Sequence, residues 1–408
     1  MTVTAVPRRP ALAFLLASLS MFGPFCIDAI FPAFPAISAQ FHATPLAMQQ
    51  TISVYLIAYA AMSLVLGAFS DAWGRRRVIL WGVFVFLAAC IGCALAQSMA
   101  MLLVFRALQG SSAGLGLIVG RALIRDCFEG ADAQRLMAQI SMIFGIAPAV
   151  APVIGAWLVA LGSWHTLFWA LGGFAALLLA ACYAVLPETH PLEKRLPLSP
   201  RPLLQRYTHI LVDAEFLLLA ATIILSFSGL FLYVVSAPGF ILGALRLTQN
   251  EFYWLFVPAI SGLVLGSILA GRLAGRVSTR ATLNIGSAIM LGAALLNIAI
   301  AYLVVPARVP WAVLPLGICG IGLNFVAPTL NLLIIDRFPQ FRGSASSVQA
   351  CMNLTFCAVL AGVVSPWIGD NARDLAWASL GLYLCGFVAW RGYRLRVKRV
   401  LAPPAAGV

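Results

Sequence analysis

Two charged residues lie inside long apolar stretches of the sequence, where a charge is energetically costly. Asp28 falls within the stretch 11–37, and Arg106 falls within the stretch 100–122. Of the 13 acidic residues, only Asp28 lies well inside such a stretch. A carboxylate removed from water favours its neutral form, whereas a nearby cation favours the ionised form. Asp28 could therefore take up and release a proton as its surroundings open and close.

Arg106 is the natural partner to consider for Asp28. With a rise of 1.5 Å per residue and antiparallel helices, both side chains come out in the outer half of the membrane at similar depth. We hypothesise that they interact directly or through water, although depth does not give rotation about a helix. Two plainer interpretations stay open: Arg106 extends to the outer surface, or Asp28 is satisfied by static hydrogen bonds at a helix end.

The composition explains why these stretches must lie in lipid. Of 408 residues, 62% are apolar and 10% are charged, with a mean hydropathy of +0.98, whereas soluble chains are roughly 45–50% apolar and about 25% charged. A spanning helix takes about 20 apolar residues. The sequence predicts twelve spans, near 11–37, 48–69, 78–97, 100–122, 137–159, 166–186, 215–241, 251–271, 282–303, 311–333, 344–365 and 375–393.

The basic residues predict the orientation of these spans. With the N-terminus inside, 22 of the 26 Lys and Arg residues fall on the cytoplasmic side, the exceptions being Arg106 and the outer Arg246, Arg308 and Arg373. Lys and Arg are retained on that side of a membrane. We therefore expect both termini in the cytoplasm. The net charge of +13 then reflects topology, and no nucleic-acid partner is expected.

The chain reads as two related halves. Residues 187–213 form the longest polar break and predict a cytoplasmic linker between six-helix bundles at 1–186 and 214–408, the second with a short basic tail. The loop after the second span aligns with the loop after the eighth at an offset of 204 residues, which pairs Gly67 with Gly271. Internal repeats of this kind are common in secondary transporters.

The first of these loops carries a family resemblance. It reads Gly67-Ala-Phe-Ser-Asp71-Ala-Trp-Gly74-Arg75-Arg76-Arg77 and resembles the signature loop between helices two and three of the major facilitator superfamily. The resemblance implies an all-α integral membrane fold of twelve helices in two pseudo-symmetric halves. In this loop a glycine permits close approach, and an aspartate and arginines can lock a cytoplasmic gate through charge-assisted hydrogen bonds. The alternative is that the arginines only set the topology.

Three further segments narrow the resemblance to drug:proton antiporters. The segment around Asp28, with its two prolines Pro32 and Pro35, resembles the first-helix signature of the bicyclomycin and chloramphenicol/florfenicol resistance (Bcr/CflA) subfamily. The segment Arg106-Ala-Leu-Gln109-Gly resembles the arginine motif of proton-coupled exporters. The fifth span resembles the antiporter motif through Pro148, Pro152 and Gly155, although Ala151 and Ala156 replace two of the usual glycines. That departure weakens the inference of export.

A substrate cavity is expected between the halves near the midplane. Polar side chains within spans tend to face the interior of a bundle, although each one can equally serve helix packing. With so few charges, the cavity should suit neutral or cationic amphiphiles. The candidate lining residues are Gln50, Tyr55, Tyr59, Gln109, Tyr233, Asn324, Asn331 and Asn353.

No cofactor or metal is expected. The nine cysteines and four histidines have no metal-binding spacing, and the only lysines, Lys194 and Lys398, are in no phosphate-binding loop. The proton gradient should supply the energy. We expect a monomer in a bacterial inner membrane, with protons, lipid and a small-molecule substrate as partners.

The leading function is therefore proton-coupled export of drugs or small amphiphiles by alternating access. An exporter of a native metabolite, such as an amino acid or a siderophore, on the same fold is the first alternative. A non-transporting polytopic receptor or an intramembrane enzyme is an alternative from another class, and we expect no enzymatic activity.

Overall fold

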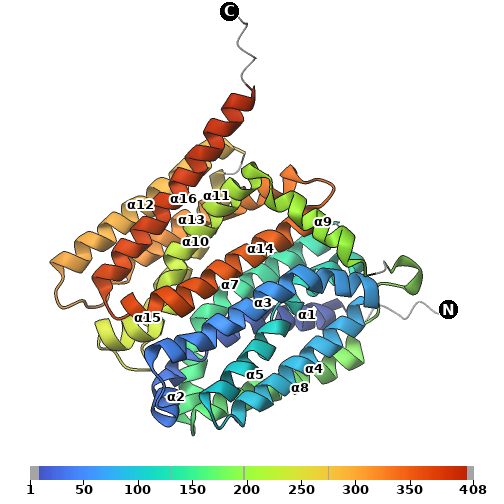
Figure 1. The fold of residues 1–408 in the computed structure, drawn as a ribbon, viewed down its shortest axis with the longest axis horizontal. Coiled ribbons are helices and arrows are strands. Elements are labelled where there is room, and N and C mark those ends of the chain that lie inside the picture. Colours follow the sequence, from blue (N-terminus) through green and yellow to red (C-terminus); the bar gives the residue numbers. More distant parts are fainter. Residues whose placement is uncertain (1–8, 129, 196–197, 274, 402–408) are drawn as a thin grey trace, which may run out of the picture. The chain divides into compact units, whose positions relative to one another are not determined.

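The structure, a computed structural model, describes residues 9–128, 130–195, 198–273 and 275–401, and within these ranges every regular element is a helix (Figure 1). The all-helical prediction is therefore confirmed. The two chain ends, which were expected in the cytoplasm, lie outside the described residues.

The chain divides into two compact units. Unit 1 comprises Met1–Ser199, Val234–Val257 and Cys357–Asp370, and unit 2 comprises Pro200–Tyr233, Pro258–Phe356 and Asn371–Val408. These units are defined by contacts between residues, whereas the bundles 1–186 and 214–408 are defined by the repeat in the sequence. The division into two repeat halves stays a prediction.

The helices of unit 1 pack around close backbone approaches. A side chain at Gly110 would overlap the carbonyl of Tyr55, and one at Gly116 would overlap the backbone of Leu19. Small residues let helices in lipid pack at this range. The helices are α1 (Arg9–Asp28), α2 (Phe34–Phe41), α3 (Pro45–Trp73), α4 (Arg75–Ala94), α5 (Met99–Ser112), α6 (Leu115–Cys127), α7 (Gly130–Ala160) and α8 (Trp164–Val185), with short 3-10 turns η1 (Phe31–Ala33) and η2 (Leu192–Lys194).

Two expected spans of this unit are interrupted. The first is broken between Asp28 and η1, where Pro32 cannot donate a backbone hydrogen bond. The fourth is broken between Ser112 and Leu115. Both breaks lie close to the charged residues found in the sequence.

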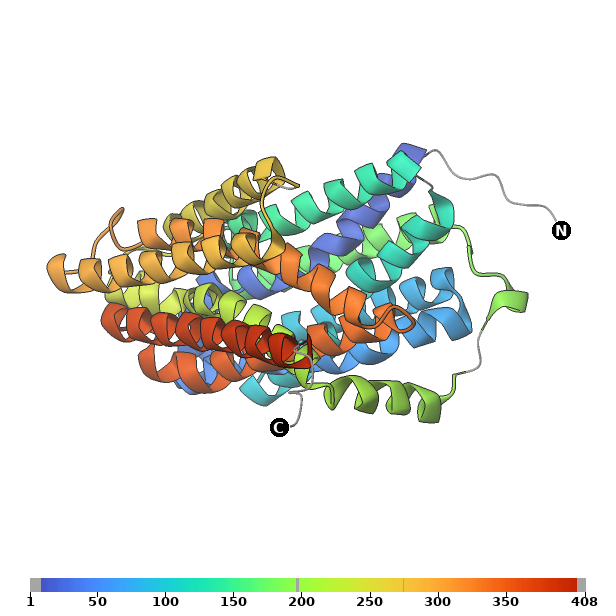
Figure 2. The same ribbon diagram turned by 90° about the horizontal axis from the view of Figure 1, so that it is seen from above.

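In unit 2, α12 is the central packing element. It contacts both α13 and α16, and the two views show α12 and α16 side by side (Figures 1 and 2). The elements from the linker onward, some of them shared with unit 1, are α9 (Pro200–Leu211), α10 (Ala214–Val235), the π-helix η3 (Gly239–Ala244), α11 (Tyr253–Leu273), α12 (Thr279–Leu303), α13 (Leu314–Arg337), α14 (Arg342–Val359), the π-helix η4 (Leu360–Val364), α15 (Ser365–Ile368) and α16 (Ala372–Leu401).

Each of the twelve expected spans coincides with a helix or a run of helices. Ten of the described helical segments are long and apolar enough to cross a membrane, and α7 supplies a shorter apolar stretch, Gly145–Ala160. The remaining span, expected at 375–393, lies on α16. For the fifth span, on α7, and the twelfth span, on α16, the count of twelve therefore rests on the sequence.

The repeat offset appears again in the helix starts. Helix α4 begins at Arg75 and α12 begins at Thr279, which are 204 residues apart, as the aligned loops are. The linker is more structured than expected, because α9 lies within it.

Candidate functional site

Arg106 on α5 is fully buried and held by neutral acceptors. Its Nε donates to the carbonyl of Thr51 at 3.1 Å, and Nη1 donates to the carbonyl of Cys26 at 3.3 Å and to Gln109 Oε1 at 2.5 Å. The ring of Tyr55 lies 4.5 Å from its Cζ. The cation is thus placed among α1, α3 and α5, and it does not extend to the outer surface.

The guanidinium is incompletely satisfied. Its Nη2 is buried without a hydrogen-bond partner among the described residues. The position is possible because Gly110 lets α5 approach the α3 backbone at Tyr55, which brings the Thr51 carbonyl within reach. A buried cation with a free donor is costly unless an acceptor arrives.

Asp28 is the last residue of α1, and its side chain is 2% exposed. Its Oδ1 has no hydrogen-bond partner among the described residues. Among the described residues, no hydrogen bond or ion pair joins Asp28 to Arg106. Arg106 instead donates to the carbonyl of Cys26. The hypothesis that Asp28 and Arg106 interact directly does not describe this conformation. The Nε and Nη1 groups of Arg106 donate to backbone and amide oxygens.

The antiporter motif packs beside Asp28. Pro148 and Pro152 lie inside α7, and Gly155 follows one turn later. A side chain at Gly155 would overlap the carbonyl of Ala29, the residue after Asp28. Gly155 is therefore what lets α7 close over the end of α1, as the small residue at that place predicts.

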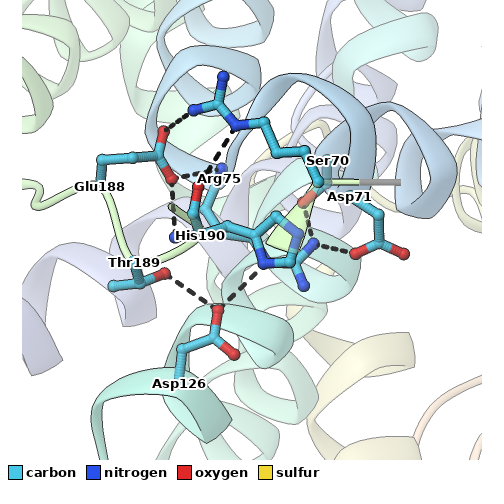
Figure 3. Close-up of polar contacts among 8 residues, drawn as sticks. Ser70, Asp71, Arg75, Asp126, Glu188, Thr189 and His190 are labelled. Carbon is cyan, nitrogen blue, oxygen red and sulfur yellow. Dashed lines mark hydrogen bonds and ion pairs between the residues drawn. The ribbon is translucent and has the colours of Figure 1, made fainter. Parts of the chain in front are cut away.

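The loop between α3 and α4 forms a charged cluster centred on Arg75. Its Nη1 bonds Ser70 Oγ at 2.6 Å and Asp71 Oδ1 at 2.5 Å, and its Nε bonds Asp126 Oδ2 at 3.2 Å. Figure 3 shows the guanidinium between these groups. Of the three arginines in the run, Arg75 is the buried one.

The neighbouring arginines have other roles. Arg76 Nη2 donates to the Tyr183 carbonyl at 2.7 Å, and its Cζ lies 5.4 Å from that ring. Arg77 is exposed, and Gly67 has open space around it. Of the three arginines in this run, only Arg75 therefore joins the charged cluster.

The start of the linker completes the cluster, which sequence reasoning missed. The Glu188 carboxylate accepts from the backbone N–H of Arg75 at 2.9 Å and lies 3.7 Å from Arg195 Nη2, while Thr189 donates to Asp126 at 3.0 Å. Gly74 has φ +95°, and a Cβ there would overlap Glu188. The signal available was the acidic residue directly after the sixth span, but its partner could not be read from spacing.

The expected cavity residues of unit 1 are engaged within the helix packing. Tyr55 OH donates to the Gly23 carbonyl at 3.0 Å, and Gln109 Nε2 donates to Cys90 Sγ at 3.1 Å. Tyr59 is buried. One cavity of about 590 Å³ in this unit is lined by Ala156, Val159, Ala160, Leu242 and residues 247–250. None of the expected residues lines it.

The expected residues of unit 2 also have partners, with one exception. Tyr233 OH accepts from Asn297 at 2.6 Å, Asn324 donates to the Leu263 carbonyl at 2.5 Å, and Asn331 accepts from Gln349 at 2.8 Å. Asn353 is half-buried. Whether these side chains line a substrate path stays a prediction.

A row of polar side chains on α3 also escaped the sequence reasoning, except for Gln50. Gln49 donates to the Val235 carbonyl at 2.9 Å, Gln50 to the Gly362 carbonyl at 3.0 Å and Ser53 to the Ala358 carbonyl at 2.9 Å. We call these three residues the α3 latch. Its acceptors lie at or beside η3 and η4, where the helical hydrogen-bond register changes and carbonyls become available.

No metal site accompanies these groups: among the described residues, no group of three His, Cys, Asp or Glu side chains could hold a metal ion. The described cysteines are free.

Comparisons with known proteins show which family this chain resembles. Residues 11–366 match the Major Facilitator Superfamily. The chain is 31% identical over 370 residues to an uncharacterized MFS-type transporter, YdgK, of Bacillus subtilis, covering 89% of this chain and 90% of that one. It is 27% identical over 366 residues to a bicyclomycin resistance protein homolog of Haemophilus influenzae, covering 88% and 90%.

A multidrug transporter, MdfA, of Yersinia pestis is 27% identical over 391 residues, covering 94% of this chain and 95% of its own. The crystal structure of the human organic anion transporter MFSD10 superposes with a TM-score of 0.67 at 17% identity, over 94% of this chain and 99% of that one. At that identity the likeness concerns the fold.

Proposed function

Because the chain belongs to the major facilitator superfamily, and is therefore a multi-pass membrane transporter and not an enzyme, we propose that it is a proton-coupled antiporter that exports drugs or small amphiphiles. We place it in the Bcr/CflA subfamily, as a monomer in a bacterial inner membrane with both termini inside. Members of the superfamily generally need no cofactor, and the proton gradient supplies the energy.

The observation that carries this proposal is the pair of incompletely satisfied charges in unit 1. Arg106 Nη2 and Asp28 Oδ1 are both buried without partners among the described residues. Intramembrane ionisable groups are expensive and mark proton relays and substrate pathways. A carboxylate in this position can bind a proton in one conformation and release it when a conformational change presents a cation or water.

Proteoliposomes with an imposed pH gradient test the coupling. Asp28→Asn should bind a fluorescent amphiphilic cation and exchange it down its own gradient, but should not accumulate it against a gradient in response to ΔpH. Arg106→Lys should also lose coupling, because an ammonium cannot reproduce the planar array of guanidinium donors. Asp374→Asn, an exposed carboxylate at the start of α16, is the matched control and should transport normally.

Full proton-driven accumulation by Asp28→Asn would refute the coupling role. Substrate class is tested separately, by expressing the chain in an efflux-deficient bacterial host and measuring resistance to phenicols, bicyclomycin and cationic dyes. A coupled protein that changes none of these resistances would export a native metabolite instead.

A further inference from the structure

Three arginines gather where α12 and α16 pack together in unit 2. The helices are antiparallel, because Arg373 and Trp377 at the start of α16 bond Ala301 and Tyr302 at the end of α12. Toward the other end, Trp390 Nε1 donates to Asn284 Oδ1 at 3.1 Å. This bond fixes which faces of the two helices meet there.

Arg280 and Arg394 extend the same contact by one helical turn. Arg280 is four residues before Asn284 on α12, and Arg394 is four residues after Trp390 on α16. In antiparallel helices these two steps run in the same direction, and residues four apart share a face. The two guanidinium groups therefore project from facing sides of packed helices at the same level, and Arg391 adds a third charge one turn back on α16.

Among the described residues, no acidic side chain pairs with these three charges. Arg394 Nη1 is buried without a partner, and no ion pair to a carboxylate involves any of the three arginines within the described part of the chain. Desolvation and the charges of Arg280 and Arg391 lower the pKa of Arg394. The proximity of the three charges is therefore unfavourable as it stands.

The acidic residues at the start of α10 are already occupied. Arg337 bonds Asp213 at 2.9 Å and Glu215 at 2.8 Å. Like charges at neighbouring helix positions are destabilising, so an anion from outside the chain would stabilise the cluster.

The surroundings of the cluster identify that anion by its chemistry. Val388 and Leu395 on α16 are 67% and 57% exposed, so apolar surface that suits lipid chains flanks the charges. Trp390, which is buried between the helices, stacks on Tyr393 with ring centroids 5.6 Å apart, and Trp and Tyr are enriched at the level of lipid headgroups. A ligand that suits the site carries a phosphate and acyl chains together.

We propose that Arg280, Arg391 and Arg394 bind the phosphate of an anionic phospholipid on the side of the membrane where α12 begins. Basic pockets between transmembrane helices on the cytoplasmic side bind such headgroups. The three arginines belong to unit 2, whereas Asp28 and Arg106 belong to unit 1, so lipid binding can be tested independently of proton coupling.

Native mass spectrometry of the detergent-purified protein, titrated with phosphatidylglycerol or phosphatidylcholine, tests this site. Wild-type protein should retain phosphatidylglycerol in preference to phosphatidylcholine. The variants Arg280→Gln and Arg394→Gln should each weaken that retention roughly fivefold, and the double variant should weaken it by more than either alone.

Thermal unfolding supplies a second readout that separates lost binding from lost folding. Without lipid, Arg394→Gln should unfold at the wild-type temperature or above, because it removes repulsion. With phosphatidylglycerol it should gain less than wild type. The double variant Arg280→Lys with Arg394→Lys keeps the charges and should largely restore the gain. Arg342→Gln, an exposed arginine at the start of α14, is the matched control and should behave as wild type.

Equal retention of the two lipids would overturn the proposal, as would unchanged phosphatidylglycerol binding by the double glutamine variant. An equal loss in Arg342→Gln would mean that general surface charge, and no built site, attracts the lipid. Displacement of phosphatidylglycerol by excess inorganic phosphate would replace the lipid with a free anion as the occupant.

Discussion

At the scale of single residues, Gly74 is the most constrained position in the charged loop. Its φ of +95° is unfavourable for any residue with a Cβ, and a Cβ would also overlap the Glu188 carboxylate. We expect Gly74→Ala to destabilise the protein by about 1–3 kcal/mol from the backbone alone and to displace Glu188 from Arg75. The check is the unfolding temperature in detergent together with the transport rate.

A double variant separates the two causes. In a Glu188→Ala background the overlap with the carboxylate is gone, and only the end of the flexible Arg195 side chain remains in the way. Adding Gly74→Ala should therefore cost less than it does in the wild type. Equal losses of stability in both backgrounds would show that Glu188 does not restrict which residue fits at position 74. The loop motif alone predicted a glycine here, but only the folded chain shows that a linker carboxylate is one reason for it.

At the scale of helices, the α3 latch joins one helix to a carbonyl in the π-helix η4 and to two carbonyls in the helices just before η3 and η4. Replacing Gln50 by Leu leaves the Gly362 carbonyl without its donor, which costs about 1–3 kcal/mol for a buried group. We expect faster hydrogen exchange in residues 357–364 and in the first half of α3. Hydrogen–deuterium exchange with mass spectrometry measures this directly.

Ser111→Ala is the matched control, because the Ser111 hydroxyl bonds a carbonyl of its own helix and that bond is exposed. Exchange in residues 357–364 that stays at the wild-type rate in Gln50→Leu would argue against the latch. The spans themselves were predictable, since lipid demands apolar runs of fixed length. The latch was not, because hydropathy does not show where a helix changes its hydrogen-bond register.

At the scale of the whole molecule, the stability of the fold should depend on pH through the ionisation of Asp213. Partial burial works against ionisation, but hydrogen bonds from Arg337 and from the backbone N–H of Phe216 outweigh it and hold the pKa of Asp213 below its usual value. A depressed folded pKa contributes stability that is present above the unfolded value of about 3.9 and is lost as pH falls through the folded value.

The unfolding temperatures of wild type and Asp213→Asn, compared over a pH series, check this. The variant should be less stable at neutral pH, by about 1 kcal/mol or less because the pair is partly exposed, and the gap should narrow below about pH 3.9. Asp336→Asn, an exposed carboxylate next to Arg337, should show no such pH dependence. A constant gap across the series would exclude ionisation as the cause.

The family and the helical fold could be read from the sequence. The sequence also picked out Asp28, Arg106 and the run Arg75–Arg77, whose functional roles stay predictions, but it did not single out Arg75 within that run. A charge inside an apolar span is costly and therefore stands out, and the spacing of glycine, aspartate and arginine in the charged loop is specific. Which residues contact each other could not be read in this way. Arg106 bonds Cys26, Thr51 and Gln109 because of helix rotations that one-dimensional spacing does not contain.

The matching starts of α4 and α12 lead to an uneven tolerance of mutation. The first has Gly74 as its N-cap, at the centre of an ion-pair cluster, whereas the second, 204 residues later, has Ser278, whose hydroxyl accepts from Ala281 N–H. In a saturation library scored for transport, positions 71, 74 and 75 should reject nearly every replacement. Positions 278 and 279 should accept many, although their backbones begin an equivalent helix, whereas Gly275 should accept few because its φ is +76°.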